Sequence, residues 1–110
     1  FNKIYQLIRD NPVKNVIFLT GDAHRAQAVA YTDGKGKELF HEFMSGPLSA
    51  FQGWKSAADQ TFHPKVIFEK FGVFNYGSLV LKRSEAQLRL VDSEGNLLFK
   101  GRFPSWVRRR

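Results

Sequence analysis

The sequence predicts an α/β fold made of one short helix, a buried strand, a β-hairpin and a C-terminal antiparallel meander. Three observations predict it. Apolar residues at helical spacing occupy residues 2–10, a continuous apolar run follows at residues 16–19, and alternating segments separated by turn residues fill residues 76–103. A helix that leads directly into a strand is typical of α/β layers and implies more sheet upstream. With 110 residues, 43% of them hydrophobic, the chain can bury the core of one modest domain.

The first element is a short amphipathic helix over residues 2–10. Ile4, Leu7 and Ile8 are spaced so that they share one side of a helix. Pro12 disfavours helical geometry at the residue before it, and we therefore expect the helix to end there.

A strand over Asn15–Thr20 follows, and we expect it to be covered on both faces because a half-exposed strand would alternate with polar residues. It ends in Gly21, Asp22 and, two residues further, His24 and Arg25. Ligands gather outside the carboxyl ends of strands in open α/β sheets. Extended geometry puts Asp22 and His24 on one side, where an acid and an imidazole suit a metal ion or a general acid/base pair. The alternative is that Asp22 caps a turn and His24 is a surface histidine.

A β-hairpin is predicted next, with strands at Gln27–Tyr31 and Leu39–Met44 around the turn at residues 33–37. Two glycines in that turn accept the positive φ that hairpins require. His41 and Glu42 must point to opposite faces of their strand, so only one of them can face the same crevice as His24. Small residues along one edge let another layer approach closely: Ala26, Ala28 and Ala30.

The pattern is irregular from Ser45–Ala50, which breaks the strand, as far as Gly72. Aromatic residues without a period usually pin a long loop onto a core. The functional alternative is a cover over the substrate, because long connections often carry function; its members would be Gln52, Trp54 and Lys55.

A three-stranded antiparallel meander completes the predicted fold. Turn-forming residues separate its strands, and Leu88 and Leu90 alternate with polar residues, so one face is expected to be packed. The predicted strands are Tyr76–Arg83, Ala86–Asp92 and Leu97–Phe103. We expect Pro104 and Trp106 to dock the terminus.

The formal net charge of +7 is compatible with an acidic partner such as nucleic acid, a phosphate-bearing substrate or an anionic membrane. Three of these charges are Arg108, Arg109 and Arg110, which a solvated tail also explains. No apolar run approaches the ~20 residues of a transmembrane helix. The absence of cysteine excludes disulfides and thiolate ligands, so any metal must be held by His, Asp, Glu or Asn.

Three sequence blocks are together more specific than the four residues after the strand: Asn15–His24, Glu42–Ala50 and Asp59–Lys70. In this order they resemble the C-terminal portion of the PhoD-like alkaline phosphatases, members of the calcineurin-like metallophosphatase superfamily. The likeness continues through Phe74–Gly77 and the meander, so it spans nearly the whole chain. The resemblance implies that residues 1–110 are the C-terminal part of a metallophosphatase-type α/β sandwich.

The resemblance also implies a metal-dependent enzyme that hydrolyses phosphomonoesters or phosphodiesters. His24 matches the metal-ligating histidine of the family's late Gly-(His/Asp)-x-His motif, and Asp22 stands where many superfamily members carry another histidine. Asp22 and His24 are therefore the expected catalytic and metal-binding residues, with iron and calcium as the implied metals and manganese or zinc as alternatives. Arg25 offers paired donors for a phosphate oxygen, although a surface ion pair also explains it. His41 and His63 match no metal motif and are interpreted as structural or surface histidines.

The family's earlier metal motifs are absent from these 110 residues. Asp22 and His24 provide too few donors for a multinuclear centre, so we expect the isolated chain to be inactive. The rest of the catalytic domain, upstream of Phe1, is the expected partner beside a phosphate ester substrate. The resemblance implies a secreted, periplasmic or cell-surface location.

The alternative function is a non-catalytic, basic and β-rich module that binds nucleic acid or a protein. Single-stranded nucleic acid would stack on aromatic rings exposed on one face of the sheet. This interpretation requires four rings, Phe74, Tyr76, Phe99 and Phe103, to be exposed beside Lys82, Arg83, Lys100 and Arg102.

Overall fold

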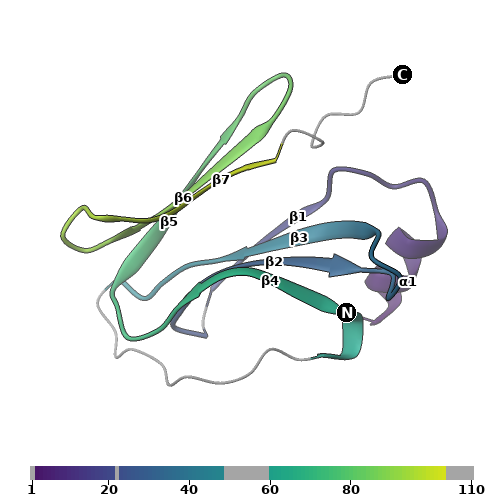
Figure 1. Cartoon of the computed structure of the whole chain (residues 1–110), viewed down its shortest axis with the longest axis horizontal. Helices are drawn as coiled ribbons and strands as arrows, with labels where there is room; N and C mark the ends of the chain where they lie inside the picture. Colours follow the sequence, from purple (N-terminus) through teal and green to yellow (C-terminus); the bar gives the residue numbers. More distant parts are fainter. Residues whose placement is uncertain (1, 22, 49–59, 104–110) are drawn as a thin grey trace.

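A computed structural model describes residues 2–21, 23–48 and 60–103, which form one α-helix and two β-sheets (Figure 1). The helix α1 spans Asn2–Asp10. The first sheet has the strand order β1-β3-β2-β4, with β1 at Ile17–Thr20, β2 at Ala26–Thr32, β3 at Glu38–Met44 and β4 at Pro64–Lys70. The second sheet has the order β5-β6-β7, with β5 at Asn75–Leu81, β6 at Ala86–Asp92 and β7 at Leu97–Phe103. The described chain is thus mostly β, with one helix packed on a mixed sheet.

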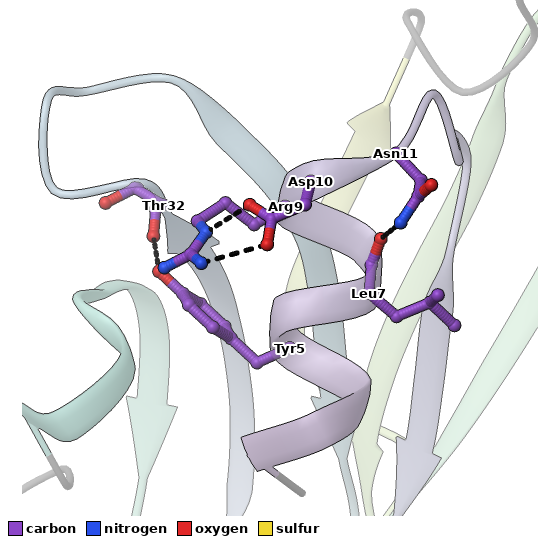
Figure 2. A network of polar contacts seen from close by, with 6 residues as sticks. All are labelled: Tyr5, Leu7, Arg9, Asp10, Asn11 and Thr32. Carbon is purple, nitrogen blue, oxygen red and sulfur yellow. Dashed lines mark hydrogen bonds and ion pairs between the residues drawn. The ribbon is translucent and has the colours of Figure 1, made fainter.

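Helix α1 has the predicted bounds, but a different side of it is buried. Tyr5 and Ile8 face the sheet and pack with Phe40, whereas Ile4 and Leu7 are exposed. The expectation that Ile4 and Leu7 share the buried side with Ile8 is therefore wrong. The reason is the Tyr5 side chain, whose hydroxyl donates a buried hydrogen bond of 2.7 Å to the carbonyl oxygen at position 32 and so fixes the rotation of the helix (Figure 2).

The C-terminal end of α1 is closed by a side chain. The Asn11 amide donates to the Leu7 carbonyl oxygen at 2.8 Å, which satisfies one of the carbonyls left without a partner at a helix end (Figure 2). Arg9 pairs with its neighbour Asp10 at 2.7 Å on the exposed side. Pro12 follows directly, as predicted for the end of this helix.

Strand β1 lies at one side of the sheet formed by the described strands, and, contrary to the prediction, it is not covered on both faces. It is shorter than predicted, and among the described strands it pairs only with β3, in parallel. Leu19 in its middle is 66% exposed. A run of apolar residues does not reveal how many neighbours a strand has. The strand that is buried along its length is β2, with Ala26, Ala28 and Ala30 all inaccessible to solvent.

The predicted hairpin is confirmed by the antiparallel pairing of β2 with β3. Gly34 and Gly36 in its turn have φ of 86° and 100°, the left-handed region that favours glycine. His41 and Glu42 lie on opposite faces, also as predicted. His41 packs against Phe103 of the second sheet, with ring centroids 4.9 Å apart, whereas Glu42 hydrogen bonds on the other face.

Strand β4 was not predicted, because its segment lay in the region interpreted as irregular. A 3-10 turn at Gln60–Phe62 precedes it, and it pairs antiparallel with β2. Val66 lies opposite Val29 while Phe68 lies opposite Ala28, so Ile67 is an extra residue at a bulge. The bulge interrupts the alternation by which a strand is recognised. The proposed substrate cover lies outside the described residues, as do all three of its members, Gln52, Trp54 and Lys55.

The meander is confirmed, and its apolar face packs on the first sheet. Leu88 and Leu90 form one core with Ala26, Ala28 and Phe43. The small alanines of β2 allow this approach, as predicted. Further contacts between the sheets include the stacked rings of Phe68 and Phe99, 4.9 Å apart. Pro104, Trp106 and the three terminal arginines lie outside the described residues.

Candidate active site at the carboxyl ends of β1 and β3

Several connections leave the first sheet at the same edge. Thr20 at the end of β1 is in register with Met44 at the end of β3, because these strands are parallel. Ala26 at the start of β2 pairs with Lys70 at the end of β4. The segments that follow β1, β3 and β4 therefore begin together, at the left edge of the sheet in Figure 1.

Two of the blocks on which the family resemblance rests, Asn15–His24 and Glu42–Ala50, meet at this edge with Asn75 of the segment Phe74–Gly77. The Ser45 N–H donates to the Thr20 carbonyl oxygen at 3.3 Å, which joins the first block to the second. The Gly46 N–H donates to Asn75 Oδ1, and Asn75 Nδ2 donates to the Gly46 carbonyl oxygen, both at 2.9 Å. The backbone N–H of Asn75 donates to the Pro47 carbonyl oxygen at 2.9 Å. Segments far apart in the sequence are thus fastened together directly after β1 and β3.

Asn75 is the side chain that makes this junction. It is completely buried, and Nδ2 also donates to the Val73 carbonyl oxygen at 3.1 Å. From the sequence, Asn75 was part of the segment Phe74–Gly77 that continues the family resemblance, and no role was predicted for it. A polar residue that opens an apolar strand was the available signal. Its role is to hold the connection after β3 in place.

His24 lies in the loop that follows β1 and is half-buried. Its φ is 60°, a left-handed conformation that is uncommon for residues other than glycine. The Ala23 N–H donates to the Gly21 carbonyl oxygen at 2.8 Å, so the chain turns sharply before His24. Asp22 lies outside the described residues, and its pairing with His24 therefore stays a prediction.

Arg25 links the loop after β1 to the connection after β4. Its Cζ lies 5.4 Å from the centroid of the Phe71 ring, within the range of a cation–π contact. The sequence suggested phosphate binding or a surface ion pair for Arg25, and it did not predict this contact with an aromatic ring. A role in binding phosphate stays a prediction.

Glu42, for which the sequence predicted only that it and His41 cannot both face the crevice with His24, is a further candidate. Thr20 Oγ1 and the Tyr31 hydroxyl each donate to one oxygen of its half-buried carboxylate, both at 2.8 Å. A carboxylate in the middle of the apolar strand β3 was the available signal. Because Thr20 is the last residue of β1, Glu42 helps to hold the strand end that leads into the loop with His24.

A pocket of about 310 Å³ lies beside this edge, between the two sheets. Leu19, Thr20 and Ser45 line it from one side, and Gly77 and Leu90 from the other. No charged side chain lines it within the described part of the chain. The pocket therefore suits an apolar group rather than a phosphate.

The described residues do not form a complete metal centre. Residues 2–21, 23–48 and 60–103 contain no group of three or more His, Cys, Asp or Glu side chains that could hold an ion. His24 supplies one imidazole, whereas multinuclear sites need several nitrogen and oxygen donors. The donor set present here accordingly does not fit the expected metals without further ligands.

The alternative of an aromatic platform for nucleic acid receives no support from the second sheet. Phe99 stacks on Phe68, and Phe103 lies 5.0 Å from Phe43, so both rings belong to the packing between the sheets. Of the four rings that this interpretation requires, Tyr76 is the one with a largely exposed side chain.

Comparison with known proteins gives one match. The family model described as PhoD-like phosphatase matches residues 2–90, from the first residue of α1 to Leu90 in β6. No curated protein and no solved structure matches the chain. Separately, none of the helices in the described ranges has the length and apolar character needed to cross a membrane.

Proposed function

This chain belongs to the PhoD-like phosphatase family, and from that premise we propose that it is part of a metal-dependent enzyme that hydrolyses phosphomonoesters or phosphodiesters. The observation that carries the proposal is the meeting of the resemblance blocks at the carboxyl ends of β1 and β3, through Thr20, Ser45, Gly46 and Asn75. Such edges are where ligands bind in open α/β sheets.

In this proposal the chain supplies the late Gly-Asp-x-His motif to a metallophosphatase-type sandwich. His24 provides one imidazole ligand, and Asp22 acts as a ligand or orients one. The guanidinium of Arg25 binds a phosphate oxygen, for which its paired N–H donors are suited. Iron and calcium are the metals proposed from the family resemblance, with manganese or zinc as alternatives. A secreted, periplasmic or cell-surface setting is proposed on the same ground.

Another polypeptide segment, the rest of the catalytic domain, supplies the remaining ligands. The shortage of donors within the described residues supports this part of the proposal. So do the exposed apolar side chains of α1, β1 and the segment between them: Ile4 is 44%, Leu7 58%, Val13 41% and Leu19 66% exposed. The outer edge of β1 is also available to pair with a further strand, since β3 is its one neighbour among the described strands.

The decisive experiment replaces His24 by alanine in the protein that contains this chain together with the rest of the catalytic domain. We expect turnover of p-nitrophenyl phosphate and bis-p-nitrophenyl phosphate to fall by roughly 100-fold or more, because even residues that only orient a metal ligand cost up to about 100-fold. The metal content, measured on the same samples, is expected to fall too.

His63→Ala is the matched control, because His63 also has a left-handed backbone, with φ of 53°. Its turnover is expected to stay near that of the unaltered protein. If His24→Ala leaves both turnover and metal content unchanged, His24 is not a metal ligand and the proposal fails.

A further inference from the structure

A pocket of about 430 Å³ lies between the α1–β1 connection and the start of β3. Val16 and Ile17 line it at the beginning of β1, and Glu38 and His41 line it from β3. Its size is within the range of about 300–1,000 Å³ that is common for small-molecule sites. His24 follows the opposite end of β1, so this pocket is separate from the candidate active site.

The apolar part of the lining comes from three different elements. Ile8 belongs to α1, Phe40 to β3 and Phe103 to β7. Ile8 and Phe40 are buried members of the core beneath the helix. The end of α1 that borders the pocket is held by the Asn11 amide (Figure 2). Ile8 and Phe40 are already covered by this packing. The apolar side chains of the lining that remain partly exposed include Val16, Ile17 and Phe103.

The charged part of the lining is predominantly cationic. The exposed cationic residues of the lining are Arg9, Lys14 and Lys37, and Arg9 is paired with Asp10. Glu38 is the one acidic residue of the lining in the described part of the chain. The Glu38 carboxylate lies close to one cation, Lys65, and to the His41 ring. One oxygen lies 3.4 Å from His41 Nε2, and the other lies 3.5 Å from Lys65 Nζ. The pocket thus combines partly exposed apolar side chains with positive charge from Lys14 and Lys37 and from the paired Arg9.

We propose that this pocket binds a small organic anion, with its apolar body against Val16, Ile17 and Phe103 and its anionic group near Lys14 and Lys37. An organic carboxylate and an organic phosphate share this chemistry. The proposal involves neither His24 nor Arg25 and does not depend on the phosphatase function.

The test is a titration of the ¹⁵N-labelled chain, followed by NMR, with four probes. Phenyl phosphate and benzoate carry both an apolar ring and an anion, inorganic phosphate carries the anion alone, and benzyl alcohol carries the ring alone. We expect the first two to shift the amide signals of Val16, Ile17 and His41 with a dissociation constant of about 1 mM or tighter, as ligands of this size allow. Inorganic phosphate and benzyl alcohol are expected to bind at least about tenfold more weakly, since each makes only part of the contacts.

Two variants locate the anionic group. Lys14→Ala and Lys37→Ala are each expected to weaken phenyl phosphate binding about threefold, the size of one exposed ion pair. Lys35→Ala is the matched control, because Lys35 lies in the same turn as Lys37 but does not line the pocket. Equal binding of inorganic phosphate or of benzyl alcohol, no loss of affinity in the two variants, or shifts confined to residues around His24 would each overturn the proposal.

Discussion

Replacing Asn75 by alanine tests whether one buried amide holds the junction behind the candidate site. The Asn75 side chain is inaccessible to solvent and makes three hydrogen bonds. It accepts one from the Gly46 N–H and donates one each to the carbonyl oxygens of Gly46 and Val73. Alanine removes all three and leaves a small cavity between the connection after β3 and the start of β5.

The expected cost follows from these contacts. Each lost hydrogen bond is worth about 1 kcal/mol net, and a buried backbone group left without a partner costs about 1–3 kcal/mol. Water that enters the cavity can satisfy some of these groups. We therefore expect Asn75→Ala to lower the free energy of unfolding by about 3–5 kcal/mol. That is a large fraction of the ~5–15 kcal/mol typical of a whole domain.

The assay is urea denaturation of the 110-residue chain followed by far-ultraviolet circular dichroism. Asn75→Asp adds a pH test, because a carboxylate oxygen then faces the carbonyl oxygens of Gly46 and Val73. Burial raises the pKa of such a carboxyl above its ordinary value. Stability that depends on the protonated form is present below the unfolded pKa and is lost as the pH rises through the folded pKa. The free energy of unfolding of Asn75→Asp, relative to that of Asn75→Ala, should therefore decrease as the pH increases from 5 to 8.

Asn96→Ala is the control, since the Asn96 side chain makes an exposed hydrogen bond to Asp92 and belongs to a surface turn. We expect it to cost less than about 1 kcal/mol. If Asn75→Ala costs no more than this control, the amide does not hold the junction. The inference that the family blocks are fastened through Asn75 would then be refuted.

Three further predictions concern individual side chains. Tyr31→Phe removes one hydroxyl donor to Glu42, so urea denaturation should show a loss of about 1–2 kcal/mol; no measurable loss would contradict this role. Hydrogen bonds from Arg102 and, to a smaller extent, from Gln87 lower the pKa of the Glu85 carboxyl. The resulting stability is present above the ordinary glutamate pKa and is lost as the pH falls through the lowered value, so Glu85→Gln should flatten the acid side of a stability–pH profile. Burial lowers the pKa of His41. The unfolded state therefore binds the proton more readily, stability falls as the pH drops below the ordinary histidine value, and His41→Gln should reduce that fall in thermal unfolding between about pH 7 and 5.

Elements with local signals could be predicted from the sequence. Pro12 marks the end of α1, and the glycines at positions 34 and 36 supply the positive φ of the hairpin turn. Leu88 and Leu90 reveal the packed face of β6 because they alternate with polar residues. Each of these signals acts within a few residues of the chain, so no knowledge of distant neighbours is needed.

Features that depend on distant neighbours could not be predicted in the same way. The exposure of Leu19 depends on how many strands flank β1, which its own residues do not encode. Strand β4 escaped recognition because Ile67 forms a bulge against β2. In α1 the apolar residues fit two overlapping sides of the helix, and the Tyr5 hydrogen bond to the backbone at position 32 selects one of them.

The residues of the candidate site show the same difference between local signals and distant partners. His24 stood out because its neighbours in the sequence form a recognisable motif, whereas Glu42 and Asn75 gain their roles from partners far away in the chain. Glu42 depends on Thr20 and Tyr31, which lie on two other strands. The proposed ligand is thus visible in a short motif, while the contacts of Glu42 and Asn75 become visible only in the folded structure.

The hydrogen bonds that join the segments at this edge do not involve the imidazole of His24. The junction at this edge is made by backbone atoms of Thr20, Ser45, Gly46 and Pro47 and by the Asn75 amide, and it needs no imidazole. A left-handed residue other than glycine costs roughly 1–2 kcal/mol, so position 24, with φ of 60°, would be occupied at lower cost by glycine. Asn15 and His63 adopt the same conformation, with φ of 60° and 53°, and neither has a place in the proposed site. The proposed role of His24 therefore rests on its motif and on its position after β1, and the comparison of His24→Ala with His63→Ala separates that role from the backbone conformation that the two residues share.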